Sequence, residues 1–210
     1  LDSREPQRVA QAVKALGLRY AVITSVTRDD LEDGVASGFA LVINEVRRYN
    51  PHCLIEVLIP DFDGSEEALA KVIAERPGVI NHNLESVPRL YSLVRPQADY
   101  HRSLRLLAEV KKRDKSILTK SGLMLGLGET RSEVLETMKD LQKVGCDLLT
   151  LGQYLQPRPD KLPVSRYLPP EEFQELRQAA IEIGFKGVEA GPLVRSSYRA
   201  SAFFSNYVIL

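Results

Sequence analysis

The alternation of apolar and polar positions predicts a chain in which strands and helices follow one another in turn. Short runs rich in Val, Ile and Leu are typical of strands that a parallel sheet buries on both faces. Such runs predict strands at 20–26, 54–59, 79–85, 118–126, 148–157 and 187–192. Helical spacing of apolar residues, with caps and prolines at the ends, predicts helices at 5–16, 37–49, from Ser65 onward, and at 87–94, 99–113, 131–144, 171–183 and 198–210.

This alternation implies βαβ units and a parallel α/β sheet. A closed barrel of eight strands needs about 250 residues, whereas this chain has 210. Either a partial, open barrel or a doubly wound sheet is therefore expected. Because no linker or low-complexity tract interrupts the pattern, we expect one domain over 1–210, in which 193–210 closes over the site.

A stretch with three glycines ends the fourth expected strand and leads into a helix. It reads Ser121-Gly-Leu-Met-Leu-Gly-Leu-Gly-Glu-Thr130. Glycine is used where a backbone takes positive φ or approaches another group closely, and Thr130 with Glu133 forms a capping box. In α/β folds a strand, a turn and a helix N-terminus form a place where ligands bind. The alternative is a tight turn that only packs well.

The balanced charge gives no electrostatic reason to expect an acidic partner. There are 28 basic and 28 acidic residues, so nothing points to nucleic acid or to an acidic membrane surface. No apolar run approaches the ~20 residues that span a bilayer. We therefore expect neither nucleic acid nor a membrane as a partner. The first residue is not Met, so we expect the chain to begin part-way through a longer protein.

The chain has two cysteines, Cys53 and Cys146, and three scattered histidines. The cysteines are far apart in sequence and form neither a disulfide framework nor a CxxC spacing. We expect both to be ordinary buried thiols. The sequence therefore predicts no self-contained metal site.

Polar residues recur where each expected strand ends. They are Thr24, Ser25, Arg28, Asp29, Asp30, Asp61, Asn81, His82, Asn83, Glu85, Lys120, Glu129, Gln153, Tyr154, Gln156, Arg195, Ser196, Ser197, Tyr198 and Arg199. Parallel α/β folds place function at the carboxyl ends of their strands. Protein interiors rarely accept so many polar groups unless these are paired or serve a ligand. Their recurrence favours a polar-ligand site over a collection of caps and loop residues.

The segment Asn81-His-Asn-Leu-Glu85 is the most specific of these. Strand alternation predicts that Asn81, Asn83 and Glu85 share one face. An amide and a carboxylate suit the adjacent hydroxyls of a ribose, because both accept from O–H groups. His82 is expected to point the other way as a structural residue. The alternative is a polar strand end that organises the following helix.

Six segments together resemble the lipoyl synthase family of radical S-adenosylmethionine enzymes. They are 24–31, 81–85, 94–100, 121–130, 149–157 and 191–198, and the resemblance runs to about residue 200. Arg195-Ser-Ser-Tyr198 and the run at 150–157 are specific to that family. The glycine stretch and the Asn-His-Asn segment are shared with other radical enzymes, including biotin synthase.

The resemblance implies a partial, open (β/α)6 barrel whose first strand is missing, and an enzyme that inserts two sulfur atoms at C6 and C8 of a protein-bound octanoyl chain. One 4Fe–4S cluster would cleave S-adenosylmethionine to a 5′-deoxyadenosyl radical, and a second would be consumed as the sulfur source. Implied partners are octanoylated carrier domains (the 2-oxoacid dehydrogenase E2 subunit and the glycine cleavage H protein), ferredoxin or flavodoxin, and a cluster carrier. Of the bacterial cytoplasm, mitochondrion and plastid, we expect the first.

The resemblance also assigns roles to residues of this chain. The cofactor set, expected to bind S-adenosylmethionine, is Thr24, Ser25, Asn81, Asn83, Glu85, Gly126, Gly128 and Gln153. Asn83 and Glu85 would meet the ribose, Gly126 and Gly128 the adenine, and Thr24 and Ser25 the methionine end. Lys120 and Arg195 are the candidate catalytic side chains. Ser196 or Ser197 would ligate the auxiliary cluster, with Ser196 preferred.

The sequence departs from the family at several points, including the missing first strand and a tail at 203–210 that is unlike the usual ending. The CxxxCxxC triplet and the auxiliary cysteine triplet are absent and are expected upstream, so this chain alone is expected to be inactive. Val35 stands where the family has a second glycine. Three rivals stay open: a biotin synthase-like enzyme, against which the Arg-Ser-Ser-Tyr motif argues; a non-catalytic fragment that binds S-adenosylmethionine or a lipoyl domain; and a barrel enzyme acting on a phosphorylated sugar.

Overall fold

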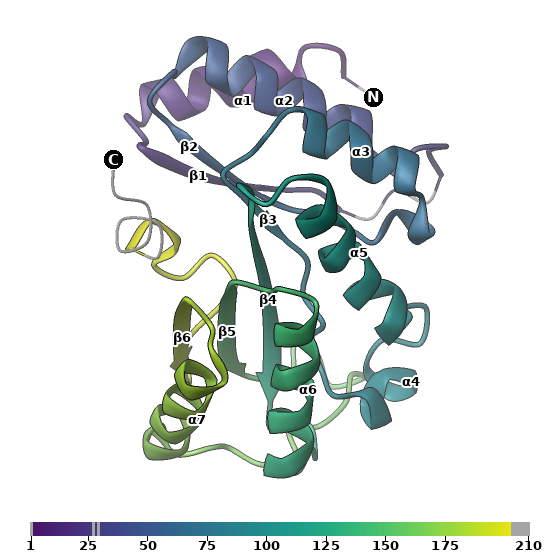
Figure 1. Cartoon of the computed structure of the whole chain (residues 1–210), viewed down its shortest axis with the longest axis vertical. Coiled ribbons are helices and arrows are strands. Elements are labelled where there is room, and N and C mark those ends of the chain that lie inside the picture. Colours follow the sequence, from purple (N-terminus) through teal and green to yellow (C-terminus); the bar gives the residue numbers. More distant parts are fainter. Residues whose placement is uncertain (1, 27, 29, 203–210) are drawn as a thin grey trace. The chain divides into compact units, whose positions relative to one another are not determined.

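The computed structural model describes residues 2–26, 28 and 30–202, and strands alternate with helices along them (Figure 1). The strands are β1 (Tyr20–Thr24), β2 (Leu54–Leu58), β3 (Val79–Asn81), β4 (Leu118–Leu125), β5 (Leu148–Gln153) and β6 (Gly187–Gly191). They form a parallel sheet in the order β1-β2-β3-β4-β5-β6, with β1 and β6 at its two ends. A doubly wound sheet reverses its strand order at a switch point. The unbroken order therefore confirms the partial, open barrel.

The helices begin and end close to where caps and prolines predicted. They are α1 (Glu5–Ala15), α2 (Ala36–Tyr49), α3 (Glu66–Ala74), α4 (Tyr91–Val94), α5 (Tyr100–Arg113), α6 (Arg131–Lys143) and α7 (Pro170–Ile183), with 3₁₀ turns η1 (Phe62–Gly64) and η2 (Pro88–Leu90). Ser65 Oγ accepts the Ala68 N–H at 3.2 Å, and both halves of the capping box at Thr130 and Glu133 are present. Of the helix expected over 198–210, residues 200–202 are helical and 203–210 lie outside the described residues.

The chain divides into two compact units. Unit 1 comprises residues 1–81 and 109–118, and unit 2 comprises 82–108 and 119–210. In unit 1, α1, α2 and α3 pack side by side along β1 and β2 (Figure 1), and Val57 is completely buried. In unit 2, α6 and α7 pack together beside β5 and β6, with Phe173 and Leu141 fully buried. The prediction of one domain over 1–210 stays a prediction.

Unit 1 contains a buried polar cluster on one face of its strands. Glu56 of β2 is 0% exposed. Its carboxylate accepts from the Tyr20 hydroxyl at 2.6 Å and from Asn81 Nδ2 at 3.0 Å. Burial and the neighbouring carboxylate raise the pKa of Tyr20 far above its ordinary value. Hydrogen bonds therefore hold a carboxylate in the interior, as a buried charge requires.

The strand expected over 79–85 is wrong beyond Asn81. Beyond it, Glu85 forms an isolated parallel bridge with Leu123 and has a φ of 66°. Strand alternation therefore does not by itself place Asn81, Asn83 and Glu85 on one face beyond β3, although Asn83 and Glu85 still contact each other through their side chains. The strands expected over 20–26 and 148–157 were likewise too long and end at Thr24 and Gln153.

The backbone conformation at Val35 is one that favours glycine. It lies at the N-cap of α2 with a φ of 74°, a left-handed conformation that is strained for a β-branched residue. Asp33 supports this turn, because its carboxylate accepts from the Val35 N–H at 3.2 Å and from the Ser37 N–H at 2.9 Å.

The two cysteines lie in different environments. Cys146 is buried as expected, whereas Cys53 is half-buried, and partial burial raises the pKa of the Cys53 thiol. Within the described part of the chain, no helix is long and apolar enough to cross a membrane.

Candidate functional site

The site is built in unit 2 on the segment 82–85, which runs beside β4. The His82 N–H donates to the Lys120 carbonyl at 3.0 Å, and the Glu85 N–H donates to the Gly122 carbonyl at 2.9 Å. Between them, the Leu84 N–H donates to Ser121 Oγ at 3.1 Å. The His82 ring lies 3.0 Å from Ser103 Oγ of α5, as expected for a structural histidine. These bonds fix the backbone from which Asn83 and Glu85 project.

The Asn83 side chain makes two hydrogen bonds and leaves one atom unpaired. Its Nδ2 donates to Glu85 Oε1 at 3.0 Å and to Ser196 Oγ at 2.7 Å. Its Oδ1 is buried and has no hydrogen-bond partner. An unpaired buried acceptor costs about 1–3 kcal/mol, so this oxygen indicates a place for a donor from a ligand.

Gly122 lets that oxygen approach the backbone of β4 closely. A Cβ atom at Gly122 would lie 3.0 Å from Asn83 Oδ1 and 2.7 Å from Thr150 Oγ1, closer than side-chain carbons approach such atoms. Gly122 is opposite Thr150 in the register of β4 and β5. We call these three residues, Asn83, Gly122 and Thr150, the cradle. Its shape agrees with the expectation that a glycine in this stretch permits close approach.

Glu85 places a carboxylate next to the cradle. Burial raises its pKa above the ordinary value, while the hydrogen bond from Asn83 and the charge of Arg95 act in the opposite direction. The Glu85 carboxylate therefore adds a largely buried hydrogen-bond acceptor. An amide oxygen and a carboxylate side by side suit two neighbouring hydroxyl groups.

Two predicted residues join the site from distant parts of the chain. Lys120 of β4 is 0% exposed, and its Nζ donates to the Ser196 carbonyl at 2.5 Å. Ser196 is therefore held through its carbonyl by Lys120 and through its hydroxyl by Asn83. Ser197 is exposed, and its carbonyl accepts from the Ala200 N–H at 3.3 Å.

Other predicted residues in unit 2 organise loops around the sheet. Glu129 accepts the N–H groups of Gly126 at 2.6 Å and Leu127 at 2.9 Å. Gln153 Nε2 donates to the Arg166 carbonyl at 3.0 Å, and its Oε1 accepts the Leu168 N–H at 2.9 Å. A Cβ at Gly126 would lie 2.2 Å from the Arg166 carbonyl oxygen. Gly126 and Gln153 thus hold the loop after β5, and their cofactor roles stay predictions.

The remaining predicted residues make other contacts or belong to unit 1. Arg195 Nη1 donates to the Val194 carbonyl at 2.7 Å, and Gly128 has a φ of 107°. Thr24, Ser25 and Asn81 belong to unit 1; Thr24 Oγ1 donates to the Leu58 carbonyl at 3.3 Å, and Asn81 Oδ1 is buried without a hydrogen-bond partner. Asp29 lies outside the described residues.

Sequence reasoning missed Thr150 and Arg95. Thr150 lies within the strand expected over 148–157. Its position opposite Gly122 depends on the register between β4 and β5, which the sequence does not report. Arg95 stood in a motif of the resemblance, yet only its fold reveals that it reaches the Asn83 carbonyl at 2.8 Å. No local sequence signal reports such contacts.

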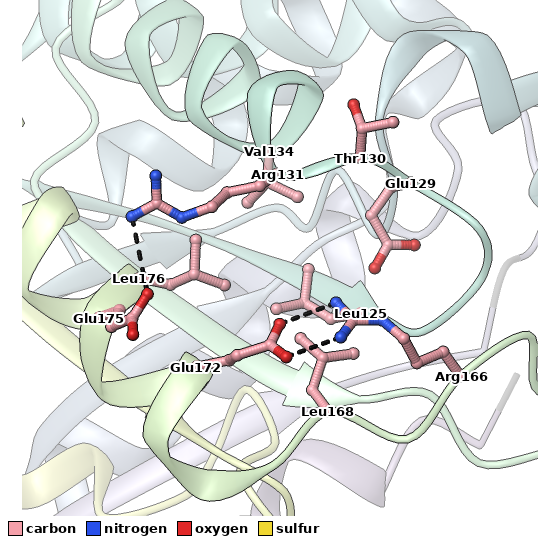
Figure 2. A pocket seen from close by; sticks show the side chains of 10 residues that line it. All are labelled: Leu125, Glu129, Thr130, Arg131, Val134, Arg166, Leu168, Glu172, Glu175 and Leu176. Carbon is pink, nitrogen blue, oxygen red and sulfur yellow. Dashed lines mark hydrogen bonds and ion pairs between the residues drawn. The ribbon is translucent and has the colours of Figure 1, made fainter.

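A cavity in unit 2 lies between the N-terminal ends of α6 and α7 (Figure 2). Its apolar lining comes from Leu125, Val134, Leu168 and Leu176. The charged lining is paired: Arg166 meets Glu172 at 2.7 and 2.8 Å, and Arg131 lies 3.9 Å from Glu175. None of the cofactor set lines it. The cradle is therefore the better candidate site.

Comparison with known proteins bears on the whole chain. A family model described as the Radical SAM superfamily matches residues 1–141. Lipoyl synthase of Caldanaerobacter subterraneus subsp. tengcongensis is 56% identical over 205 residues, covering 98% of this chain and 72% of that protein. Lipoyl synthase of Caldicellulosiruptor saccharolyticus is 56% identical over 200 residues, covering 95% of this chain and 70% of that protein.

Solved structures support the fold. The crystal structure of methylornithine synthase (PylB) has a TM-score of 0.57 at 12% identity, covering 90% of this chain and 61% of that chain. The radical S-adenosylmethionine methyltransferase TsrM from Kitasatospora setae has a TM-score of 0.52 at 16% identity, covering 79% of this chain and 32% of that chain. These likenesses concern the arrangement of the backbone, which is that of a partial barrel.

Proposed function

The chain belongs to the lipoyl synthase family of the radical S-adenosylmethionine superfamily, and from this premise we propose that its cradle binds the ribose of S-adenosylmethionine. The observation that carries the proposal is the buried, unpaired Oδ1 of Asn83, which approaches the backbone of Gly122 closely because that residue has no side chain. A ribose hydroxyl that donates to this oxygen would satisfy it. Glu85 accepts from the second hydroxyl.

The reaction we propose is insertion of sulfur at C6 and C8 of an octanoyl chain carried on a protein. Iron–sulfur clusters, held by cysteines that this chain lacks, would supply the electron for cleavage of S-adenosylmethionine and the inserted sulfur. In this chain Gly126 and Gly128 let the backbone pass near the adenine, and Thr24 and Ser25 lie at the methionine end. Lys120 and Arg195 act near the reacting groups, with Lys120 holding the Ser196 carbonyl. Asn81 and Gln153 complete the cofactor set.

Ser196 is the proposed hydroxyl ligand of the auxiliary cluster. Its half-buried position and its bonds to Asn83 and Lys120 support it over the exposed Ser197. The two cysteines do not supply the thiolates of a 4Fe–4S cluster, which needs about four good ligands, and no group of three His, Cys, Asp or Glu side chains suited to a metal occurs among the described residues. The residues of this chain alone do not fit a cluster, and we derive no step through one.

The substrates we propose are octanoylated lipoyl-carrier domains, namely those of the 2-oxoacid dehydrogenase E2 subunit and the H protein. A ferredoxin or flavodoxin would supply electrons, and a carrier would renew the auxiliary cluster. By itself the 210-residue chain is expected to be inactive. The paucity of cysteines favours a second candidate for the isolated chain, a non-catalytic fragment that binds S-adenosylmethionine or a carrier domain.

Calorimetry of S-adenosylmethionine binding tests the ribose site. The protein is the full-length enzyme, meaning a lipoyl synthase polypeptide that contains this chain together with the cluster cysteines. Asn83→Ala and Glu85→Ala should each weaken binding by about 1–3 kcal/mol, because each removes one hydrogen-bonding group. Asn44→Ala and Glu136→Ala, at positions outside the cradle on α2 and α6, serve as controls and should bind normally. Unchanged affinity in both Asn83→Ala and Glu85→Ala would exclude the proposed ribose site.

A further inference from the structure

Arg95 contacts the backbone of the site from outside the sheet. Pro96 follows it, and a residue before proline is disfavoured in the helical conformation, so α4 ends at Val94 and Arg95 adopts a φ of −140°. Its Nη1 donates to the Asn83 carbonyl at 2.8 Å and reaches the Leu84 carbonyl at 3.4 Å. One guanidinium group thus holds the two peptide oxygens between Asn83 and Glu85.

Aromatic residues of unit 2 hold the guanidinium group in place. It lies over the Tyr91 ring, with the central carbon 5.7 Å from the ring centroid, and its Nη1 is 3.4 Å from the Tyr91 hydroxyl. The Tyr91 ring meets the edge of Tyr100 at a centroid distance of 5.4 Å. The Tyr100 hydroxyl donates to Asp140 of α6 at 3.1 Å. Arg95 is therefore braced by α4, α5 and α6.

The segment that Arg95 holds is one that would not keep its shape unaided. Glu85 has a φ of 66°, a conformation that is uncommon for residues other than glycine and persists where surrounding contacts enforce it. On the sheet side these contacts come from Ser121 and Gly122, whose oxygens accept the Leu84 and Glu85 N–H groups. On the opposite side, Arg95 takes the carbonyls of Asn83 and Leu84.

Charge adds to this geometry. Burial raises the pKa of Glu85 and the positive charge of Arg95 lowers it. Among the described contacts, the ionisable groups that act on Glu85 are Arg95 and the Tyr91 hydroxyl, whose own pKa is raised by burial and further by Glu85. The next cation of the site, Lys120, donates to Ser196 instead. Arg95 is thus the cation that favours the carboxylate form of Glu85.

We propose that Arg95 is the positioning residue of the ribose site. By holding the carbonyls of Asn83 and Leu84, it keeps the Asn83 amide and the Glu85 carboxylate turned toward the cradle. Arg95 does not touch the ligand and acts through these two residues. The proposal rests on the proposed function, because it assumes that the cradle binds S-adenosylmethionine.

Two substitutions separate the hydrogen bonds of Arg95 from its charge. Arg95→Lys keeps the positive charge but replaces the planar guanidinium group, whose Nη1 reaches both carbonyls, with a shorter side chain that ends in an ammonium group. Arg95→Gln loses the charge and keeps a short donor. Binding of S-adenosylmethionine to the full-length enzyme is measured by calorimetry from about pH 5 to about pH 8, a range above the ordinary pKa of a glutamate. Thermal unfolding of each variant is recorded alongside.

Arg95→Gln should bind about 10-fold or more weakly at pH 7, the usual cost of losing a charged hydrogen bond. Its affinity should also begin to fall at a higher pH than in the parent, since Glu85 without the nearby cation takes up a proton more readily. Arg95→Lys should bind more weakly with no shift of that acidic limb. Arg105→Gln, at an exposed arginine of α5, is the matched control and should change neither quantity.

The proposal is overturned if Arg95→Gln and Arg95→Lys both bind like Arg105→Gln. Should Arg95→Gln fail to fold, Arg95→Lys still decides the matter, because undiminished affinity in that variant would exclude the positioning role. Asn83→Ala and Glu85→Gln are measured in the same series. If these two bind normally, the ribose site itself is wrong; if they bind weakly while the Arg95 variants do not, the positioning role alone is wrong.

Discussion

Asn83 Nδ2 donates to Ser196 Oγ across 2.7 Å, which joins two motifs that are 113 residues apart in the chain. The same nitrogen donates to Glu85 Oε1 at 3.0 Å. A primary amide has two N–H donors, so both are used, and the carbonyl oxygen is left facing the cradle. Ser196 therefore helps to set the direction of the one buried acceptor that we assign to the ribose. This bond physically connects the Arg-Ser-Ser-Tyr motif with the proposed ribose site.

Filling the cradle should abolish much of the binding while leaving the fold intact. In Gly122→Ala the new methyl group would lie 3.0 Å from Asn83 Oδ1 and 2.7 Å from Thr150 Oγ1, so it would displace the Asn83 amide to which we assign a ribose hydroxyl. Affinity for S-adenosylmethionine should fall about 10-fold or more, corresponding to loss of a hydrogen bond in the site. Overpacking should cost about 1–3 kcal/mol of stability.

Gly191→Ala is the matched control for this test. Gly191 lies in the same unit, and a Cβ there would meet Val194 at an ordinary contact distance of 3.5 Å. Its affinity should equal that of the parent enzyme. Binding by Gly122→Ala that matches the Gly191→Ala control would show that the cradle is not used by the ligand.

Replacing Val35 with glycine should stabilise the chain. The φ of 74° at Val35 is strained for a valine and ordinary for a glycine, and such strain costs on the order of 1–3 kcal/mol. Part of this gain is offset by the greater entropy of glycine in the unfolded chain. We expect a net increase of about 1 kcal/mol in the free energy of unfolding, measured with urea. A decrease as large as that of Val26→Gly, at an exposed valine, would contradict this account of the turn.

The buried pair of Tyr20 and Glu56 should make stability depend on alkaline pH. The pKa of Tyr20 in the folded chain is raised above its ordinary value of 10.0, so stability from the neutral hydroxyl is fully present below the unfolded pKa. It is lost as pH rises above about 10. In Tyr20→Phe the free energy of unfolding should fall by about 1–3 kcal/mol at pH 7, because Glu56 loses a donor, and the decline caused by Tyr20 above pH 10 should disappear. Equal urea midpoints for parent and variant across this range would refute the assignment.

Local signals in the sequence predicted most of the secondary structure. Apolar runs marked the six strands, of which β3 and β5 are buried at every residue, as a parallel sheet covered on both faces requires. Ser65 and Thr130 marked helix starts correctly because a cap bonds to a backbone group only three residues away. The partial barrel followed from the alternation together with the resemblance.

Contacts between distant residues decided what the sequence could not predict. β3 stops at Asn81 because the next residues bond separately to Ser121, Gly122 and Arg95, and no local pattern reports these partners. The cradle depends on the register that sets Gly122 opposite Thr150. The bond between Asn83 and Ser196 depends on where the chain returns after β6.

Ser196 and Ser197 belong to the motif that separates this family from other radical enzymes, so their substitution is the most direct test of the proposed function. In full-length enzyme supplied with octanoylated carrier, S-adenosylmethionine and reductant, 5′-deoxyadenosine and lipoyl product are quantified for Ser196→Ala and Ser197→Ala. Ser196→Ala should still form 5′-deoxyadenosine but little lipoyl product, because it loses the proposed cluster ligand, whereas the exposed Ser197→Ala should form both. Normal lipoyl formation by Ser196→Ala would contradict the assignment, and normal formation by both variants would remove the role we give to the Arg-Ser-Ser-Tyr motif.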